Sequence, residues 1–153
     1  MLLFGGYIIN KHLNQMKFTR HATAIWQGTG MEGKGLISTQ SKTLENDQLS
    51  FKSRFESGVG TNPEELVAAA HAGCFSMKLA FVLSELGYTP SSIHTTAKAT
   101  LEDGSISNIT LELNAQIPGI SNEEFQKAAL NAKETCPVSK LLNAAITLNA
   151  VLS

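Results

Sequence analysis

TNPEELVAAAHAGCFSMKLAFVLSELG, residues 61–87, predicts a long helix with well-marked ends. Asn62 can cap the helix, Pro63 suits its first position, and the two glutamates after Pro63 place carboxylates at the positive end of the helix dipole. Gly87 tolerates the left-handed backbone conformation that commonly ends a helix. We therefore expect one helix from about residue 62 to about Leu86.

The centre of this helix, LVAAAHAGCFSMKLAFVL, is apolar on nearly every side. A surface helix would carry a polar face that recurs with the 3.6-residue period, and this stretch does not. Its alanines and Gly73 would allow another backbone to approach closely. We expect the helix to be buried all round, by a sheet on one side and by a second helix or subunit on the other.

Upstream of the helix, the sequence predicts three antiparallel strands. Residues 17–26 alternate in character, the glycine-rich turn that follows leads into GLIST at residues 35–39, and LSFKSRF at residues 49–55 alternates again. On the last strand Phe51 and its apolar neighbours would share one face. Arg54 would lie on the other face, where its default interpretation is a solvated cation.

Downstream, the chain predicts two paired strands, two helices and a final strand. Residues 92–102 and 107–117 read as strands that are joined by Asp103-Gly104, a preferred hairpin turn. A capping-box pattern opens a helix at residues 121–135, and a short helix and the strand AITLNAVL complete the chain. The whole pattern indicates the α+β class, with antiparallel sheets packed around the long helix.

Length and composition favour a single domain over residues 16–153, preceded by an extension at residues 1–15. The extension lacks the basic region and cleavage site of a signal peptide, so we expect a cytoplasmic protein. A formal net charge of −1 without any Lys/Arg cluster disfavours binding to nucleic acid. No run of about eighteen apolar residues predicts a membrane span.

The sequence contains two cysteines, Cys74 and Cys136. A reducing compartment gives structural disulfides little support, so the default interpretation is that both are small, buried apolar residues. Cys74 lies deep in the long helix, far from its N-terminus. Cys136 precedes Pro137 at the start of the short helix, where free backbone N–H groups favour a thiolate. Local chemistry alone therefore leaves Cys136 open as the nucleophile.

Other catalytic or metal sites are disfavoured by spacing. His71 precedes Cys74 by one helical turn, but residues so placed are more often packing neighbours, and a Cys-His hydrolase would lack its third, orienting group. Two cysteines and four scattered histidines give neither a CxxC nor an HxxxH pattern, so we expect no metal. The absence of CxxC also disfavours a general disulfide oxidoreductase.

SRFESGVGTNPEELVAAAHAGCFSMKLAFVLSELGYTP at residues 53–90, together with TCPVSKLL at residues 135–142, closely resembles the OsmC branch of the OsmC/organic hydroperoxide reductase family. The likeness covers nearly everything from residue 16 to the end. It implies a cysteine-based peroxidase in which Cys74 attacks the peroxide. Cys136 would then capture the sulfenic acid as a disulfide.

The same resemblance places the family's active-site arginine on Arg54 and the glutamate that orients it on Glu64. In the related hydroperoxide-reductase branch the arginine comes from an earlier strand, which makes Arg20 the alternative. A guanidinium close to Cys74 would lower the pKa of its thiol, and a carboxylate would fix the guanidinium fork.

The resemblance also implies organic hydroperoxides, including lipid-derived ones, as substrates, a lipoyl-type dithiol as external reductant, and no cofactor. Glu64 and Cys74 are ten residues apart, or about 15 Å along one continuous helix, which is too far for one arginine of the same chain to hold both. An intertwined homodimer would resolve this conflict. The competing hypothesis is a non-enzymatic carrier of small apolar molecules whose cysteines are incidental.

Overall fold

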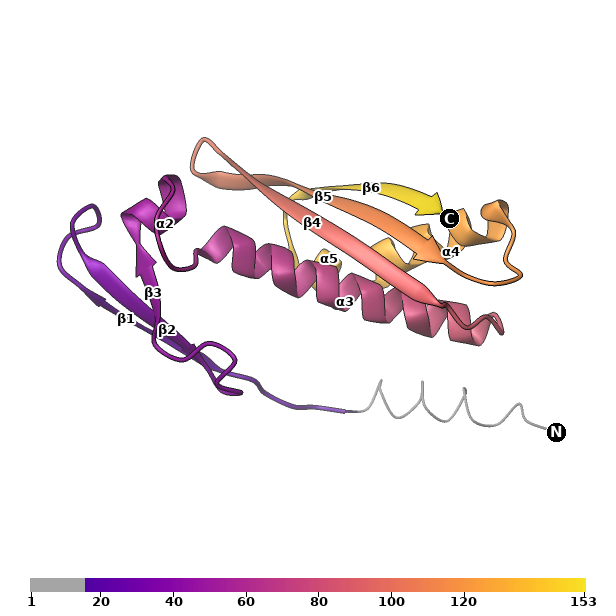
Figure 1. The fold of residues 1–153 in the computed structure, drawn as a ribbon, viewed down its shortest axis with the longest axis horizontal. Coiled ribbons are helices and arrows are strands. Elements are labelled where there is room, and N and C mark those ends of the chain that lie inside the picture. Colours follow the sequence, from indigo (N-terminus) through magenta and orange to yellow (C-terminus); the bar gives the residue numbers. More distant parts are fainter. Residues whose placement is uncertain (1–15) are drawn as a thin grey trace. The chain divides into compact units, whose positions relative to one another are not determined.

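The computed structural model describes residues 16–153, so the predicted extension at residues 1–15 lies outside the described part of the chain. The described part of the chain divides into two compact units, a first that ends at Pro63 and a second over Glu64–Ser153. Each unit has its own three-stranded sheet, and the long helix begins where the first unit ends (Figure 1).

The first unit holds an antiparallel meander of β1 (Ala22–Gln27), β2 (Lys34–Thr39) and β3 (Asp47–Ser50). The sheet confirms the predicted antiparallel opening, but β1 is shorter at its start than the predicted strand at residues 17–26. Ala22 pairs with Thr39, the last residue of β2, so residues 17–21 have no strand opposite them.

The predicted strand at residues 49–55 is wrong beyond Ser50, because α2 (Phe51–Phe55) is a helical turn. Ser50 Oγ accepts a hydrogen bond from Ser53 N at 3.1 Å, and Ser53 Oγ accepts one from Ser50 N at 2.9 Å. This reciprocal capping box starts a helix and outweighs the alternating pattern that suggested a strand. Arg54 therefore lies on a helical turn rather than on a strand.

The sheet of the first unit leaves large apolar side chains exposed. Every residue of β1 is exposed, including Ile25 at 59% and Trp26 at 41%. The Trp26 indole lies across β2, since a Cβ on Gly35 would come within 2.6 Å of Trp26 Cε3, and its Nε1 donates to the Thr29 carbonyl at 3.2 Å. A sheet with this much exposed apolar surface has little core of its own.

The second unit contains α3 (Pro63–Glu85), β4 (Ser92–Glu102), β5 (Ser105–Gln116), α4 (Asn122–Thr135), α5 (Pro137–Leu141) and β6 (Ala145–Leu152). β4 and β5 form the predicted hairpin. β6 pairs with β5 in parallel, so the expectation of purely antiparallel sheets is wrong for this strand. The crossover through α4 and α5 returns the chain to the same end of the sheet, which a parallel pair requires.

The ends of α3 and α4 follow local signals in the sequence. At the end of α3, Gly87 has φ +86°, Tyr88 N donates to Leu83 O and Gly87 N donates to Ser84 O, which is the hydrogen-bond pattern of a Schellman motif. α4 begins with the predicted capping box between Ser121 and Glu124. The predicted bounds of both helices are closely confirmed.

One core fills the second unit. Phe75, Leu79 and Leu83 of α3 are completely buried, and they belong to one apolar cluster with the inward residues of β5 and the small residues of α4. The side of α3 that faces away from this cluster carries Gly73, which is exposed, together with Met77 at 66% and Phe81 at 40% exposure. The single chain therefore confirms burial of α3 on one side only, and burial of the other side by a second subunit stays a prediction.

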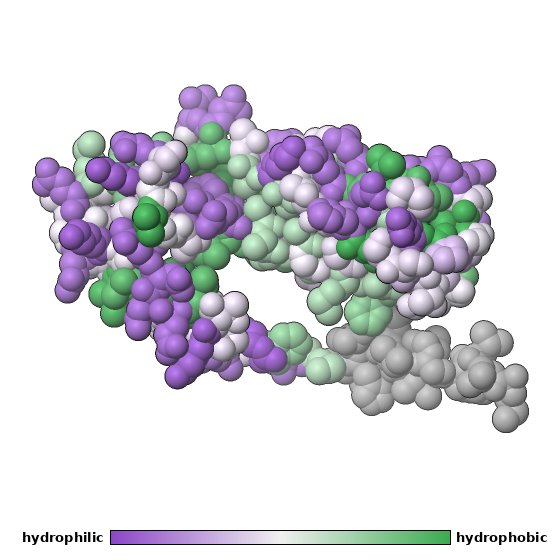
Figure 2. Space-filling model, in the orientation of Figure 1, coloured by the Kyte–Doolittle hydropathy of each residue, from purple (hydrophilic) through white to green (hydrophobic). Residues whose placement is uncertain are grey.

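Among the described residues, α3 is long and apolar enough by length and composition to cross a membrane, so the expectation that no run of about eighteen apolar residues could do so is wrong. Core helices of soluble proteins pass the same test, and the packing of α3 in the core of the second unit identifies it as one of these. Apolar residues reach the surface in many places between hydrophilic ones (Figure 2).

Candidate active site

The two cysteines meet in the second unit. Cys74 comes from the middle of α3 and Cys136 from the residue that precedes α5. Cys136 Sγ donates to Cys74 Sγ at 3.1 Å, and both cysteines are free thiols. Cys136 is completely buried and Cys74 partly buried. The packing of α5 beside α3 thus brings into contact two cysteines that are 62 positions apart in the sequence.

The surroundings of Cys74 act on its acidity in opposite directions. Burial raises the pKa of the Cys74 thiol, and the contact with Cys136 acts in the same direction. A hydrogen bond from the backbone N–H of Val138 and the charge of Lys78 lower that pKa. Because burial has the largest effect, the thiol in a single chain ionises less readily than an ordinary cysteine, and a peroxide-attacking thiolate needs further positive charge.

The start of α5 favours a different cysteine from the one that local sequence suggested. Cys136 occupies the N-cap position with Pro137 in the first turn, but its side chain makes no capping hydrogen bond. The N–H of Val138 instead acts on the sulfur of Cys74. The backbone group that was expected to stabilise a Cys136 thiolate therefore stabilises the Cys74 thiolate.

His71 is completely buried one turn before Cys74, and it is not paired with that cysteine. His71 Nε2 lies 2.8 Å from the Oγ of Ser139 on α5. Burial lowers the pKa of His71, so the imidazole is neutral at pH 7. Sequence reasoning missed Val138 and Ser139 because no local pattern indicates which residues of α5 face α3.

Arg54 lies in the first unit, on α2. Its guanidinium carbon is 5.0 Å from the centroid of the Phe55 ring. Arg54 also lines a cavity of about 270 Å³ whose other walls include Trp26 and Leu49. A cation beside aromatic and aliphatic side chains is an arrangement that could receive an anionic or polar group with an apolar tail.

Glu64 lies in the first turn of α3, ten residues before Cys74 on the same unbroken helix. The helical rise separates the two residues by about 15 Å along the axis. The alternative arginine, Arg20, precedes β1, and its Nη1 donates to the Thr19 carbonyl at 3.2 Å. Its guanidinium carbon is 4.8 Å from the centroid of the Phe18 ring.

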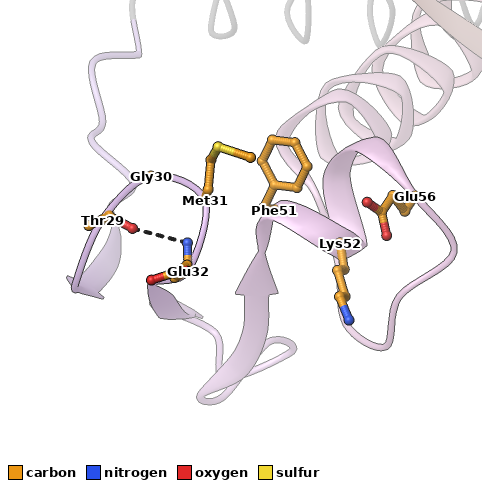
Figure 3. Close-up of a pocket in the computed structure, with 7 residues that line it drawn as sticks. All are labelled: Thr29, Gly30, Met31, Glu32, Phe51, Lys52 and Glu56. Atoms are coloured by element: carbon orange, nitrogen blue, oxygen red, sulfur yellow. Dashed lines mark hydrogen bonds between the residues drawn. The ribbon is translucent and has the colours of Figure 1, made fainter.

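A larger and more open cavity of about 520 Å³ in the first unit is lined by the loop before β2 and by α2 (Figure 3). Met31 and Phe51 point toward each other across it, with Lys52 and Glu56 on the helical side. It contains no cysteine. Within residues 16–153, no group of three or more histidine, cysteine, aspartate or glutamate side chains is placed to hold a metal ion.

Comparison with known proteins identifies the family. The sequence pattern of the family described as "OsmC-like protein" matches residues 56–151. The peroxiredoxin OsmC of Escherichia coli is 44% identical over 138 residues, which cover 88% of this chain and 96% of that protein. An organic hydroperoxide resistance protein-like protein of Staphylococcus aureus is 32% identical over 126 residues, covering 77% and 89% of the two chains.

Solved structures of related proteins are also similar to this chain. The organic hydroperoxide resistance protein OhrB of Bacillus subtilis is similar with a TM-score of 0.62 and 25% identity, covering 89% of this chain and 98% of its own. An OsmC-like protein from Vibrio cholerae shares the fold at a TM-score of 0.69 and 14% identity, covering 88% and 100%. With a matching family pattern over most of its length and a relative of 44% identity, this chain belongs to the OsmC-like family.

Proposed function

We propose that this protein is a thiol-dependent peroxidase that reduces organic hydroperoxides to alcohols. The observation that carries the proposal is the 3.1 Å contact between Cys74 Sγ and Cys136 Sγ, both as free thiols. Two cysteines at this distance can alternate between dithiol and disulfide with little movement of the chain. The names of the relatives, a peroxiredoxin and organic hydroperoxide resistance proteins, support the same reaction.

In the first step, the Cys74 thiolate attacks the terminal oxygen of the hydroperoxide. A sulfur–oxygen bond forms, the oxygen–oxygen bond breaks, and the alkoxide that leaves takes a proton to become the alcohol. Cys74 becomes a sulfenic acid. We assign the attack to Cys74 because it is the more accessible of the two thiols, and because the Val138 N–H and Lys78 favour its thiolate.

In the second step, Cys136 captures the sulfenic acid. Its sulfur supplies the electron pair of the new disulfide, the sulfur–oxygen bond of Cys74 breaks, and the oxygen leaves as water with the proton of the Cys136 thiol. A disulfide needs a sulfur–sulfur distance of about 2.05 Å, so the two atoms must approach by only about 1 Å. An external dithiol, for which we propose a lipoyl-type reductant, then restores both thiols by exchange.

Arg54 and Glu64 are proposed to complete the site. Burial alone raises the pKa of Cys74, and a permanently charged guanidinium would reverse this effect and would also bind the departing oxygen. Glu64 would hold the guanidinium in place with charge-assisted hydrogen bonds. One arginine cannot easily contact both Glu64 and Cys74 of one helix, because the two residues are about 15 Å apart along its axis.

We therefore propose an intertwined homodimer in which Arg54 and Glu64 of one chain complete the site at Cys74 of the other. Two surfaces support this assembly, namely the outer side of α3 with Met77 and Phe81, and the uncovered sheet of the first unit. An obligate interface of this kind would bury more than about 2,000 Å². Residues 16–153 would then act as one OsmC-like domain, in the reducing cytoplasm, where both thiols are kept available.

One titration separates this function from that of a non-enzymatic carrier. One equivalent of an alkyl hydroperoxide should remove both free thiols of the peroxidase, whereas a carrier keeps both. Cys74→Ser should abolish peroxide consumption, and Cys136→Ser should allow one turnover and leave a trappable sulfenic acid on Cys74. A sulfenic acid on Cys136 in the Cys74→Ser protein would reverse the assignment of the two cysteines.

A further inference from the structure

Besides the hydrogen bond from the Val138 N–H to Cys74, two side-chain contacts join α3 to α5 and the residue before it, one helical turn apart. On α3, His71 precedes Cys74 by three residues, and at α5 Cys136 precedes Ser139 by three. Cys74 contacts Cys136 at 3.1 Å and His71 contacts Ser139 at 2.8 Å. The earlier residue on α3 contacts the later residue at α5, and the later residue contacts the earlier one. The two segments therefore run antiparallel.

Apart from the Val138 N–H bond to Cys74 and its contacts with α4, α5 has few other means of holding its position. It is five residues long and none of its residues is buried. A helix of this length has almost no stability of its own, so tertiary contacts must hold it. Val138 and Leu142 are only partly buried against the core. The His71–Ser139 contact is therefore a specific link that can fix the register of α5 against α3.

The chemistry of His71 suits a fixed link. The imidazole is completely buried, and its Nδ1 has no hydrogen-bond partner. An unpaired N–H donor is rarer in a protein interior than an unpaired lone pair, so the proton of the neutral ring belongs on Nε2, which donates to Ser139 Oγ. The hydrogen bond of His71 is made to Ser139 and not to either cysteine sulfur, so an effect of this bond on the sulfurs passes through α5.

We propose that the His71–Ser139 hydrogen bond is the positioning device for disulfide closure, holding Cys136 opposite Cys74 while the sulfenic acid forms. The inference rests on the peroxidase function proposed above and extends it to the second step. Closure competes with attack of a second hydroperoxide on the sulfenic acid, which gives the irreversible sulfinic acid. By keeping α5 in register, the link favours closure and protects Cys74 from overoxidation.

The test compares three serine variants. Ser139→Ala removes the hydroxyl, and Ser139→Thr keeps it. Ser76→Ala is the matched control, because Ser76 on α3 also makes a short side-chain bond, 2.7 Å to Thr95, but toward β4 and not toward α5. Sulfenic acid formation, disulfide closure and sulfinic acid are followed separately by rapid quenching and mass spectrometry after a hydroperoxide pulse.

We expect Ser139→Ala to slow closure about ten-fold, which corresponds to about 1.4 kcal/mol of lost positioning free energy. Sulfinic acid should accumulate at peroxide concentrations that the unmodified protein tolerates, and sulfenic acid should form at a rate within about three-fold of normal. Ser139→Thr should restore closure to within about two-fold, and Ser76→Ala should leave it unchanged. Normal closure in Ser139→Ala, or equal slowing in Ser76→Ala, would overturn the proposal.

A second measurement separates failure of this inference from failure of the proposed function. If hydroperoxide leaves the thiols of the unmodified protein intact, the peroxidase function is wrong. The positioning role is then tested without peroxide, by equilibrating the protein in a glutathione redox buffer and measuring the fraction of Cys74–Cys136 disulfide. Ser139→Ala should lower the effective concentration of the two thiols about ten-fold relative to Ser76→Ala, and an equal value would refute it.

Discussion

Gly73 offers a sharp test of the proposed dimer. It lies on the exposed side of α3, and a Cβ built on it would have no atom within 4 Å outside the neighbouring backbone. A Cβ at this exposed position therefore fits the single chain without a clash, and a longer side chain can extend toward solvent. In a helix interior, replacing glycine with alanine contributes about 0.5–1 kcal/mol of stability. A destabilising effect of a large residue must come from a partner that approaches this surface.

We expect Gly73→Trp to weaken the dimer strongly. Overpacking a close interface costs about 1–3 kcal/mol per site, and a two-fold interface contains the substitution twice, which gives about 2–6 kcal/mol. Such a loss raises the dissociation constant by about 30-fold to 10⁴-fold. Gly73→Ala is the matched control and should keep the dimer. Sedimentation equilibrium measures the dissociation constant, and circular dichroism verifies that the helix is retained.

The reasoning would be refuted if Gly73→Trp formed dimers as tightly as the unmodified protein. The outer side of α3 would then be free of any subunit, and the partner surface would have to lie elsewhere. A chain that lost its helical signal together with dimerisation would indicate an obligate dimer, in which folding and assembly are one equilibrium. In that case the stability of both variants should rise with protein concentration with the same slope, and Gly73→Trp should need a higher concentration than Gly73→Ala to fold.

Three further predictions follow from the site. Refolding an inactive Cys74→Ser chain together with an inactive Arg54→Ala chain should restore up to one intact site per heterodimer, and heterodimers without peroxidase activity would show that each site is built within one chain. An alkyl hydroperoxide should be reduced at least about ten-fold more efficiently than hydrogen peroxide, since each buried methylene contributes about 0.8 kcal/mol; equal kcat/KM values would contradict this. Burial lowers the pKa of His71 in the folded chain. In the unfolded chain His71 binds a proton near the ordinary histidine pKa of about 6.5, while the folded chain does not. The free energy of unfolding should therefore fall as pH decreases from about 7 to 5. Urea unfolding should show this slope reduced in His71→Gln, and an unchanged slope would mean that His71 is not the group responsible.

Much of the fold could be predicted because its boundaries are set locally. The start of α3 at Pro63 and its end before Gly87 depend on residues within one turn of each boundary. The wrong strand prediction at α2 also arose from local signals. The alternating pattern favoured a strand, but the capping box between Ser50 and Ser53, which is equally local, starts a helix. The parallel pairing of β6 depends on how the α4–α5 crossover packs, which no local pattern records.

The candidate site divides in the same way. Motif resemblance singled out Cys74 and Cys136, and the structure brings their sulfurs together. The contributions of Val138 and Ser139 could not be predicted, because they depend on the register of α5 against α3 and not on residue type. Arg54 belongs to the first unit, and its assignment to the site remains a prediction that the mixed-chain experiment tests.

The fluorescence of Trp26 can report on the surroundings of the first unit's sheet. It is the only tryptophan in the sequence, it is 41% exposed, and its indole N–H is already bonded to the Thr29 carbonyl. All tryptophan fluorescence of the chain therefore originates on the sheet of the first unit. If a second subunit covers that sheet, as the proposed dimer requires, the emission maximum should move to shorter wavelength on assembly, and stopped flow can then time assembly without any added dye.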